Sequence, residues 1–273
     1  MAVSCGCLEK APNCFSRGDC KMRLKNYVSM ITGVSSGSGI GRAIARLFAM
    51  EGSSLVLSSY RQDEAAMRAL AGELEDYGSR VLLFDGDLSS EETVRKLVAA
   101  AEMQFGKVDV LVNSIGISQQ LPLSQLTLAD WERMLSVDLT AVFLTCREVL
   151  PLMLRQNFGR IINVASQIGQ KGAVECCHYA AAKAGVIGFT KSLAREVGGS
   201  GITANCIAPG PIITEMLANT PPEWVKNKKA ELVIPRIGEA FEVAPTAVFL
   251  ASAPDGNLYT GQTLGPNCGD VML

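Results

Sequence analysis

Short apolar runs rich in β-branched residues alternate with amphipathic segments along the chain from residue 27 onward. The runs predict strands at 28–32, 55–59, 80–84, 108–113, 160–165, 202–207 and 261–264. Apolar residues three and four apart predict helices at 42–51, 63–77, 90–105, about 131–156 and about 179–197, the third capped by Ser89 or Ser90. This alternation predicts an α/β fold, a doubly wound parallel sheet with helices on both faces.

The composition limits the kind of protein that this chain can be. Its 273 residues contain no Pro-rich or Ser-rich linker and no repeat, so we predict a single domain over residues 22–273. A hydrophobic fraction of 48% excludes a disordered chain, and 25 basic against 27 acidic residues give no footprint for nucleic acid. No apolar run reaches the roughly 18 residues of a membrane span, and the start lacks the apolar core of a secretory signal. We therefore expect a cytoplasmic protein without a membrane contact.

Four of the nine cysteines crowd into the first 21 residues, at Cys5, Cys7, Cys14 and Cys20. Their spacings of 2, 7 and 6 do not match a zinc finger or zinc ribbon, so we expect no metal. Without a secretory signal, reduced thiols are favoured over a disulfide framework. Residues 1–21 are interpreted as a flexible leader or as an over-long predicted start, because residues 22–26 are typical of a beginning before a strand.

A glycine-rich loop, residues 32–41, lies between the first predicted strand and the first predicted helix. Glycines let the backbone approach a pyrophosphate, whose charge is stabilised at a helix N-terminus. Glycine patterns also occur in ordinary turns, but the position between a strand and a helix favours a dinucleotide site. Open parallel sheets bind ligands at the carboxyl ends of their strands, which is where this loop falls.

The end of the second predicted strand indicates which dinucleotide binds. A carboxylate about 20 residues past the glycines would hold the ribose 2′-hydroxyl of NAD. Here the strand ends in Ser58-Ser59-Tyr60-Arg61, without an acid. Arg61 can pair with a 2′-phosphate, although a solvated surface arginine would fit the pattern too. The sequence thus favours NADP(H) over NAD(H).

Three polar residues near the fifth and sixth predicted strands suggest a catalytic set. Ser166 follows the strand at 160–165, and Tyr179 and Lys183 are four residues apart on one helix face. A lysine ammonium beside a phenol favours the phenolate and should lower a pKa that begins near about 10. Such a tyrosine can exchange protons near neutral pH, while the serine hydroxyl can hydrogen-bond a carbonyl oxygen.

Because of these motifs the sequence resembles the short-chain dehydrogenase/reductase family over residues 22–269. Within that family it resembles the 3-oxoacyl-(acyl-carrier-protein) reductases most. The matching motifs are Thr32-Gly33 with Gly39-Ile40-Gly41, Asp87-Leu88, Ser166, Tyr179 with Lys183, and Pro209-Gly210-Pro211-Ile212 with Thr214. The closer likeness is carried by residues 22–26, 159–163 and 259–263. The resemblance implies a Rossmann-type sheet and an NAD(P)-dependent oxidoreductase.

The resemblance also implies roles for particular residues. Tyr179 would be the acid/base, Ser166 would position the substrate carbonyl, and Lys183 would bind the nicotinamide ribose and tune Tyr179. Asp87 and Leu88 would contact adenine, Asn113 and Gly116 would lie along the ribose and pyrophosphate edge, and Ile212 and Thr214 would hold the carboxamide or phosphates. The cofactor site would further include Gly33, Ser36, Gly37, Ser38, Gly39, Ile40, Gly41, Arg61, Pro209 and Gly210.

Two departures from the family pattern bear on this site. Gly33, Gly37 and Gly39 satisfy the glycine motif literally, but the register of the following helix places the last family glycine at Gly41. The loop is then two residues longer than usual and must bulge around 34–38. Asp138 stands where the family usually has a catalytic asparagine that anchors a water; its charge is expected to pair with Lys183 and weaken the effect of Lys183 on Tyr179.

Several other residues have simpler interpretations. His178, the only histidine, is interpreted as a helix-start or cleft-lining residue, and Cys176 and Cys177 as small packing residues near the substrate entrance. Residues 215–235 fall where the family has its substrate lid. The apolar faces of the helices containing Trp131 and Tyr179 resemble the oligomer surfaces of the family, which implies a homotetramer or homodimer, but they fit a core equally well.

These observations predict an enzyme that interconverts a ketone, such as a 3-oxoacyl thioester, and a secondary alcohol by hydride transfer with NADP(H). The partner is therefore a small-molecule substrate. The alternative is a dinucleotide-binding scaffold or regulatory protein with little turnover, motivated by the longer glycine loop and by Asp138.

Overall fold

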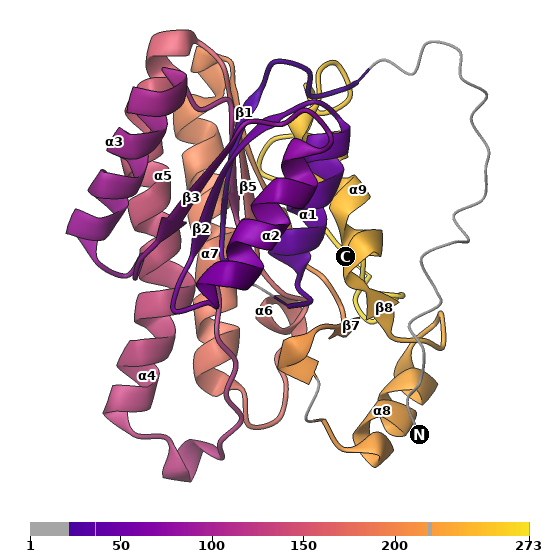
Figure 1. Ribbon diagram of the computed structural model, residues 1–273. Coiled ribbons are helices and arrows are strands. Elements are labelled where there is room, and N and C mark those ends of the chain that lie inside the picture. Colours follow the sequence, from indigo (N-terminus) through magenta and orange to yellow (C-terminus); the bar gives the residue numbers. More distant parts are fainter. Residues whose placement is uncertain (1–21, 36, 218–219, 273) are drawn as a thin grey trace.

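The computed structural model describes residues 22–35, 37–217 and 220–272 (Figure 1). The expected leader at 1–21 and the expected cofactor contact of Ser36 lie outside the described residues. Seven parallel strands form one sheet in the order β3-β2-β1-β4-β5-β6-β9. They are β1 (Val28–Thr32), β2 (Ser54–Ser59), β3 (Val81–Asp85), β4 (Val110–Asn113), β5 (Gly159–Val164), β6 (Ile202–Ile207) and β9 (Thr263–Leu264). The predicted doubly wound parallel sheet is confirmed.

Helices cover both faces of this sheet in two layers (Figure 1). One layer is α1 (Ile40–Met50), α2 (Glu64–Glu75) and α9 (Ala240–Ala251), and its apolar side chains share a core cluster with β1 and β2. The other is α3 (Glu91–Phe105), α5 (Ala141–Gln156) and α7 (Cys177–Val197), whose apolar side chains form a second cluster. The central strands β1, β4, β5 and β6 are buried along their whole length, as a sheet covered on both faces requires.

Shorter elements surround one end of the sheet. They are α4 (Leu128–Leu135), a π-helical turn (Ser136–Thr140), α6 (Ile168–Lys171), α8 (Pro222–Glu231) and a small parallel pair, β7 (Ile212–Ile213) with β8 (Gly238–Glu239). Three 3₁₀ turns, Leu123–Gln125, Gly198–Ser200 and Glu215–Leu217, complete the described elements. Figure 1 shows α6, β7 and α8 gathered at the same end of the molecule.

Local sequence signals explain where several helices begin. The Asp63 side chain accepts a hydrogen bond from the backbone of Ala66 at the start of α2, and Ser90 does the same for Thr93 at the start of α3. Thr127 and Asp130 form a reciprocal capping box on α4. Of the two serines proposed as the cap of the third helix, Ser90 is the one used.

Three differences from the sequence prediction have physical causes. The helix predicted at about 131–156 begins at Leu128 and is divided into α4 and α5 by the π-helical turn. α9 was not predicted because it is apolar on nearly every side and contains Pro245, so it has neither a polar face nor an unbroken helical pattern. α8 was not predicted either, because its polar composition gives no apolar stripe.

The sheet order reverses between β1 and β4, because β1 pairs with β2 on one side and with β4 on the other. In open α/β sheets the ligand crevice lies at the carboxyl ends of the strands at this reversal. The glycine loop after β1 and residues 114–116 after β4 therefore flank the expected crevice.

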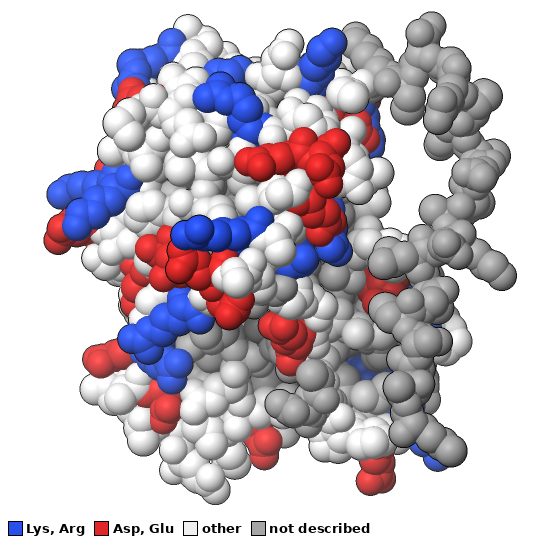
Figure 2. Space-filling model, in the orientation of Figure 1, with Lys and Arg blue, Asp and Glu red and all other residues white. Residues whose placement is uncertain are grey.

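The surface carries mixed charge, and acidic and basic side chains are interspersed on the face drawn in Figure 2. Surface ion pairs include Arg46 with Glu73 and Arg155 with Glu102. Among the described residues, none of the helices combines the length and the apolar character needed to cross a bilayer.

Candidate active site

Ser166, Tyr179 and Lys183 come together at the carboxyl end of β5. Ser166 follows this strand by two residues, and its Oγ accepts a hydrogen bond from the backbone N–H of Ile168 at 3.1 Å. Tyr179 and Lys183 lie one turn apart on α7, and Lys183 Nζ is 5.7 Å from the centre of the Tyr179 ring. A strand end and a helix start thus bring a hydroxyl, a phenol and an ammonium group to one place.

Lys183 is buried, with 3% of its surface exposed, and its ammonium is held from three directions. Nζ lies 3.1 Å from Asp138 Oδ2 and donates to the carbonyl oxygens of Val164 at 3.3 Å and Ile115 at 3.4 Å. These contacts tie α7 to the π-helical turn and to the ends of β5 and β4. They fix the ammonium on the same side of α7 as the phenol.

Asp138 is fully buried on the π-helical turn, a kind of local irregularity that is frequent at functional sites. Its Oδ1 accepts a hydrogen bond from the backbone N–H of Ile117 at 2.8 Å. A Cβ added to Gly116 would lie 2.9 Å from Asp138 Oδ2 and 3.1 Å from Lys183 Nζ. Glycine at 116 therefore leaves the space that the buried ion pair occupies.

The pKa of Tyr179 is raised above its ordinary value, because burial of the phenol outweighs the field of Lys183 and a hydrogen bond with Ser166. The charge of Asp138 raises it further. The expectation that Lys183 would give this tyrosine a lowered pKa is wrong for the net shift, because that expectation did not include the burial. Burial is the largest influence on the pKa of Lys183 and lowers it, but the charge of Asp138, the Tyr179 phenol and the hydrogen bond to Asp138 together outweigh burial and leave that pKa raised.

The glycine loop fits a pyrophosphate at the start of α1. α1 begins at Ile40, and its N-cap residue, Gly39, is extended and provides no side-chain cap, so the first N–H groups of the helix have no side-chain acceptor there. Gly33 has a φ of +70°, and an added Cβ would lie 2.6 Å from Ile115 Cα. Gly41 rather than Gly39 makes the close approach to the end of β1, since its Cβ would lie 3.0 Å from Gly33 O. This agrees with the helix register, with the extra residues in the loop.

The extra loop residues contact the segment after β7. A Cβ on Gly37 would lie 1.5 Å from Glu215 Oε1, so the Glu215 carboxylate rests on the glycine loop. In the same segment Ile212 is buried, and the hydroxyl of Thr214 donates to the carbonyl oxygen of Ile212 at 3.5 Å. The expected lid region thus reaches the loop expected to hold the cofactor.

Pro209 and Gly210 lie between the Ser166 segment and the C-terminal turn, residues 266–269. The carbonyl oxygen of Pro209 accepts from the N–H of Gln167 at 3.1 Å, and Gly210 donates its N–H to Pro266 O at 3.2 Å. A Cβ on Gly210 would lie 2.7 Å from Asn267 Cα. The close packing explains glycine at this position.

The residues expected around the adenosine lie in different surroundings. Arg61 is exposed after the end of β2, with its guanidinium carbon 4.9 Å from the centre of the Tyr60 ring. Asp87 is partly buried and accepts from the N–H and the hydroxyl of Ser89 at 2.9 and 2.7 Å. Leu88 is only 2% exposed, so its side chain belongs to the core.

The side chain of Asn113 points into the sheet and away from the expected cofactor edge. Its side chain is fully buried: Oδ1 accepts from Thr145 at 2.8 Å and from Thr32 at 3.3 Å, and Nδ2 donates to Asn163 at 2.9 Å. These bonds join β1, β4, β5 and α5. The carboxamide is thus committed inside the sheet, which leaves only the backbone of Asn113 to face a ligand.

The residues beside Tyr179 are placed as follows. His178 is fully buried at the second position of α7, with Nε2 3.3 Å from Gln119 Oε1, which agrees with a helix-start residue. Cys176 is buried and Cys177 is exposed. Sequence reasoning missed Gln119, because a polar residue in a loop carries no motif.

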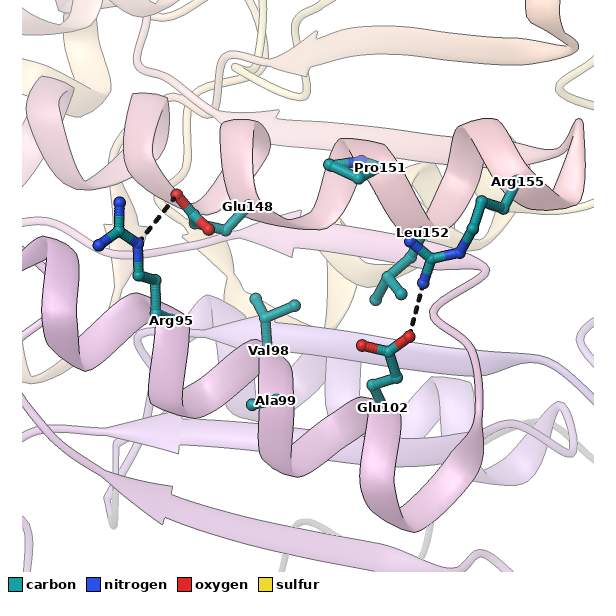
Figure 3. Close-up of a pocket in the computed structure, with 8 residues that line it drawn as sticks. All are labelled: Arg95, Val98, Ala99, Glu102, Glu148, Pro151, Leu152 and Arg155. Carbon is teal, nitrogen blue, oxygen red and sulfur yellow. Dashed lines mark hydrogen bonds and ion pairs between the residues drawn. The ribbon is translucent and has the colours of Figure 1, made fainter.

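Two cavities lie apart from the Ser166, Tyr179 and Lys183 side chains. The first, of about 270 Å³, lies between α3 and α5; in Figure 3 the ion pairs Arg95–Glu148 and Arg155–Glu102 flank an apolar floor that includes Val98 and Leu152. The second, of about 370 Å³, lies beside the C-terminal turn and the start of α9. Neither is lined by Ser166, Tyr179 or Lys183, but Ile212, which is expected to border the cofactor, lines the second.

A parallel sheet whose order reverses between β1 and β4, with a glycine loop at the reversal and with a serine, a tyrosine and a lysine near the ends of β4 and β5, is typical of NAD(P)-dependent oxidoreductases with a Rossmann-type sheet. Comparison with known proteins agrees: the sequence model of a family described as Enoyl-(Acyl carrier protein) reductase matches residues 33–269. The chain belongs to the short-chain dehydrogenase/reductase family.

Curated relatives match this chain over nearly their whole length. The 3-oxoacyl-[acyl-carrier-protein] reductase of Synechocystis sp. is 38% identical over 250 residues, 92% of this chain and 99% of the relative. The enzyme of that name from Vibrio cholerae is 37% identical over 252 residues, 92% of this chain and 100% of its own. Nodulation protein G of a Rhizobium species is 39% identical over 245 residues, 90% of this chain and 97% of the relative.

Proposed function

We propose that this protein reduces a 3-oxoacyl thioester, or a similar ketone, to the secondary alcohol with NADPH, and catalyses the reverse reaction when alcohol and NADP⁺ are supplied. The observation that carries the proposal is the convergence of Ser166, Tyr179 and Lys183 at the carboxyl end of β5. The names of the relatives from Synechocystis and Vibrio support the substrate class.

The cofactor fits the residues that flank the crevice. The uncapped start of α1 and the glycine loop, Gly33 to Gly41, would hold the pyrophosphate, and Arg61 would pair with a 2′-phosphate. Asp87 and the backbone of Leu88 would border the adenine, and the backbones of Asn113 and Gly116 the adjoining ribose. Pro209, Gly210, Ile212 and Thr214 would lie against the carboxamide or the phosphates.

Held by these residues, a reduced nicotinamide would provide the hydride that the carbonyl carbon needs. Ser166 Oγ donates a hydrogen bond to the carbonyl oxygen, where negative charge develops. The Tyr179 hydroxyl gives this oxygen its proton, and Lys183 stabilises the phenolate that remains. Because burial keeps the pKa of Tyr179 raised, the phenol is protonated at neutral pH and ready to donate. In the reverse direction the phenolate accepts the proton.

The test is the rate of NADPH oxidation with a 3-oxoacyl thioester. We expect Tyr179→Phe to lower kcat by about 10²–10⁴-fold, as for the loss of a general acid, while NADPH binding measured by fluorescence is retained. Full activity in this variant would reject the mechanism. The dinucleotide-binding scaffold remains the rival: calorimetric binding of NADPH without turnover on a broad panel of ketones would favour it.

The same assay tests the cofactor preference. A hydrogen bond to a charged group contributes about 1.5–3 kcal/mol, so we expect Arg61→Ala to raise the KM for NADPH roughly 10–100-fold. The KM for NADH serves as the internal control and should stay within about twofold, because NADH lacks the phosphate. An equal change for both cofactors would reject the role of Arg61.

A further inference from the structure

Asp270, in the turn that ends the described chain, lies between two lysines from other segments. Its Oδ1 is 2.5 Å from Lys171 Nζ, and its Oδ2 is 2.7 Å from Lys228 Nζ. The Asp270 side chain is only 5% exposed and that of Lys228 only 10%. Burial works against the charge of Asp270, but the two ammonium groups outweigh it and hold the pKa of this carboxyl below its ordinary value.

The three residues belong to three different segments, and one of them, α6, contacts the candidate active site directly. Lys171 is the last residue of α6, which starts two residues after Ser166. Lys228 lies on α8, in the segment expected to be the substrate lid. Asp270 follows the C-terminal turn, where Pro266 and Asn267 pack on Gly210. One carboxylate therefore joins the segment after Ser166, the lid helix and the C-terminal turn.

α8 has little else to hold it. Lys228 is the one buried residue of this described helix, and no side chain caps its N-terminus. After α8, Val233 lies against Gly269 and the N–H of Ile234 donates to Cys268 O at 3.0 Å. Within α8 no apolar residue is buried, although Leu232 directly after it is. A helix without a buried apolar face depends on such anchors for its position.

α6 carries Lys171 at one end and contacts the catalytic side chains directly, so it connects the ion pairs of Asp270 to Ser166 and Lys183. A Cβ on Gly169 would lie 2.7 Å from the carbonyl carbon of Lys183, so α6 packs directly on α7 at the catalytic lysine. The first N–H of α6, that of Ile168, binds Ser166 Oγ. A shift of α6 at Lys171 would thus move both the Ser166 hydroxyl and the backbone of Lys183.

We propose that Asp270 is a positioning residue that latches the lid helix α8, through Lys228, to α6, through Lys171, and so fixes the entrance to the active site. Asp270 does not touch the reacting atoms. It determines the positions of the Ser166 hydroxyl, through α6, and of the lid helix α8. The latch deepens the proposed reductase function and rests on it for its kinetic effect, but its structural effect is independent of turnover.

The kinetic test is Asp270→Asn, which removes the charge and keeps the shape. We expect the KM for the ketone to rise at least fivefold while kcat changes less than twofold, and Asp270→Glu to restore most of the loss. Glu231→Gln is the matched control, because Glu231 pairs with Lys228 at 3.0 Å on the exposed side of α8 and does not contact Asp270. A KM unchanged in Asp270→Asn, or raised equally in Glu231→Gln, would overturn the proposal.

Amide hydrogen exchange tests the latch without any turnover. In Asp270→Asn, exchange in residues 222–231 should become at least tenfold faster, while exchange in the central strands stays unchanged. Lys228→Met, which breaks only the α8 arm, should reproduce this result if Asp270→Asn fails to fold. Unchanged exchange in α8, or faster exchange throughout the molecule, would reject the latch whether or not the protein reduces ketones.

Discussion

At the scale of single residues, the buried pair of Asp138 and Lys183 sets the chemistry of the site. Where the family usually has an asparagine, this chain places a carboxylate 3.1 Å from the lysine ammonium. The pair is neutral as a whole, so Tyr179 faces less positive charge than a lone lysine would provide. The result is a phenol that keeps its proton over a wide pH range.

We expect Asp138→Asn to lower the pKa of Tyr179, because the substitution removes a negative charge that disfavours the phenolate. Reduction needs the protonated phenol, so the alkaline limb of the kcat/KM profile should move to lower pH by about one unit. Turnover at pH 7 should rise because the proton is given up more easily. Asp130→Asn is the control, because Asp130 lies on α4 and bonds to Thr127 and Gln119 instead of to Lys183. Identical profiles for both variants would contradict the prediction.

The sequence predicts which residues of the candidate site lie close together, but it does not predict whether their pKa values rise or fall. The spacing of Tyr179 and Lys183 predicts one helix face, and the strand before Ser166 predicts its place at the sheet edge. The net pKa shift of Tyr179 depends on burial by segments far apart in the sequence, so spacing alone could not give it. The commitment of Asn113 to the sheet interior escaped prediction for the same reason.

At the scale of elements, the register of α1 decides whether Gly39 or Gly41 is the last glycine of the glycine-loop motif. Gly33, Gly37 and Gly39 match the glycine pattern literally, yet Gly41, not Gly39, approaches the backbone of Gly33 at the end of β1. The amphipathic pattern of the helix predicts this correctly, because a two-residue slip would turn its apolar face outward. By contrast α9 escaped prediction, since a helix that is apolar on nearly every side carries no such pattern.

Two glycine substitutions separate a glycine required by the fold from one that is not. Gly33→Ala should lower the free energy of unfolding by about 1–3 kcal/mol, since alanine is strained at a φ of +70° and its Cβ would meet the Ile115 backbone. Gly72→Ala, within α2 and with open space around it, should raise this free energy by about 0.5–1 kcal/mol. Urea unfolding measures both; shifts of the same sign would contradict this account of the glycine loop.

At the scale of the whole molecule, the two helical layers enclose the sheet so completely that polar groups are buried with it. Cys146 and Cys206 lie among the residues packed between the sheet and α5 and α7. Exposed Phe143 on α5, whose ring centre is 6.4 Å from that of Phe189 on α7, leaves part of this layer open to water. A homodimer or homotetramer over this layer and a cytoplasmic location stay predictions.

The buried thiols predict how stability changes at high pH. Burial raises the pKa of Cys146 to about 12 and that of Cys206 to about 11, whereas unfolded thiols ionise near about 8.5. Stability from keeping these thiols neutral is therefore complete below about pH 8.5 and is lost as the pH rises toward 11 and 12, by up to about 1.4 kcal/mol per pH unit for each thiol.

Urea unfolding from pH 7 to pH 10 measures this loss. Cys206→Ser should flatten the decline, since the hydroxyl can still donate to Thr190, as the thiol does at 3.2 Å, without ionising in this range. Cys177→Ser is the control, because an exposed side chain changes its surroundings little on unfolding. A decline equally steep in the Cys206 variant and the wild type would contradict the prediction.

The distribution of buried and exposed thiols also allows a single fluorescent dye to be attached near the candidate active site. Cys177 is exposed at the first position of α7, two residues before Tyr179, whereas Cys146, Cys176 and Cys206 are buried and shielded from reagents. In a chain that starts at Met22, with Cys268 replaced by glycine, a maleimide dye would label Cys177 selectively. Its emission would report on the entrance of the site while substrate and cofactor come and go, without any engineered cysteine.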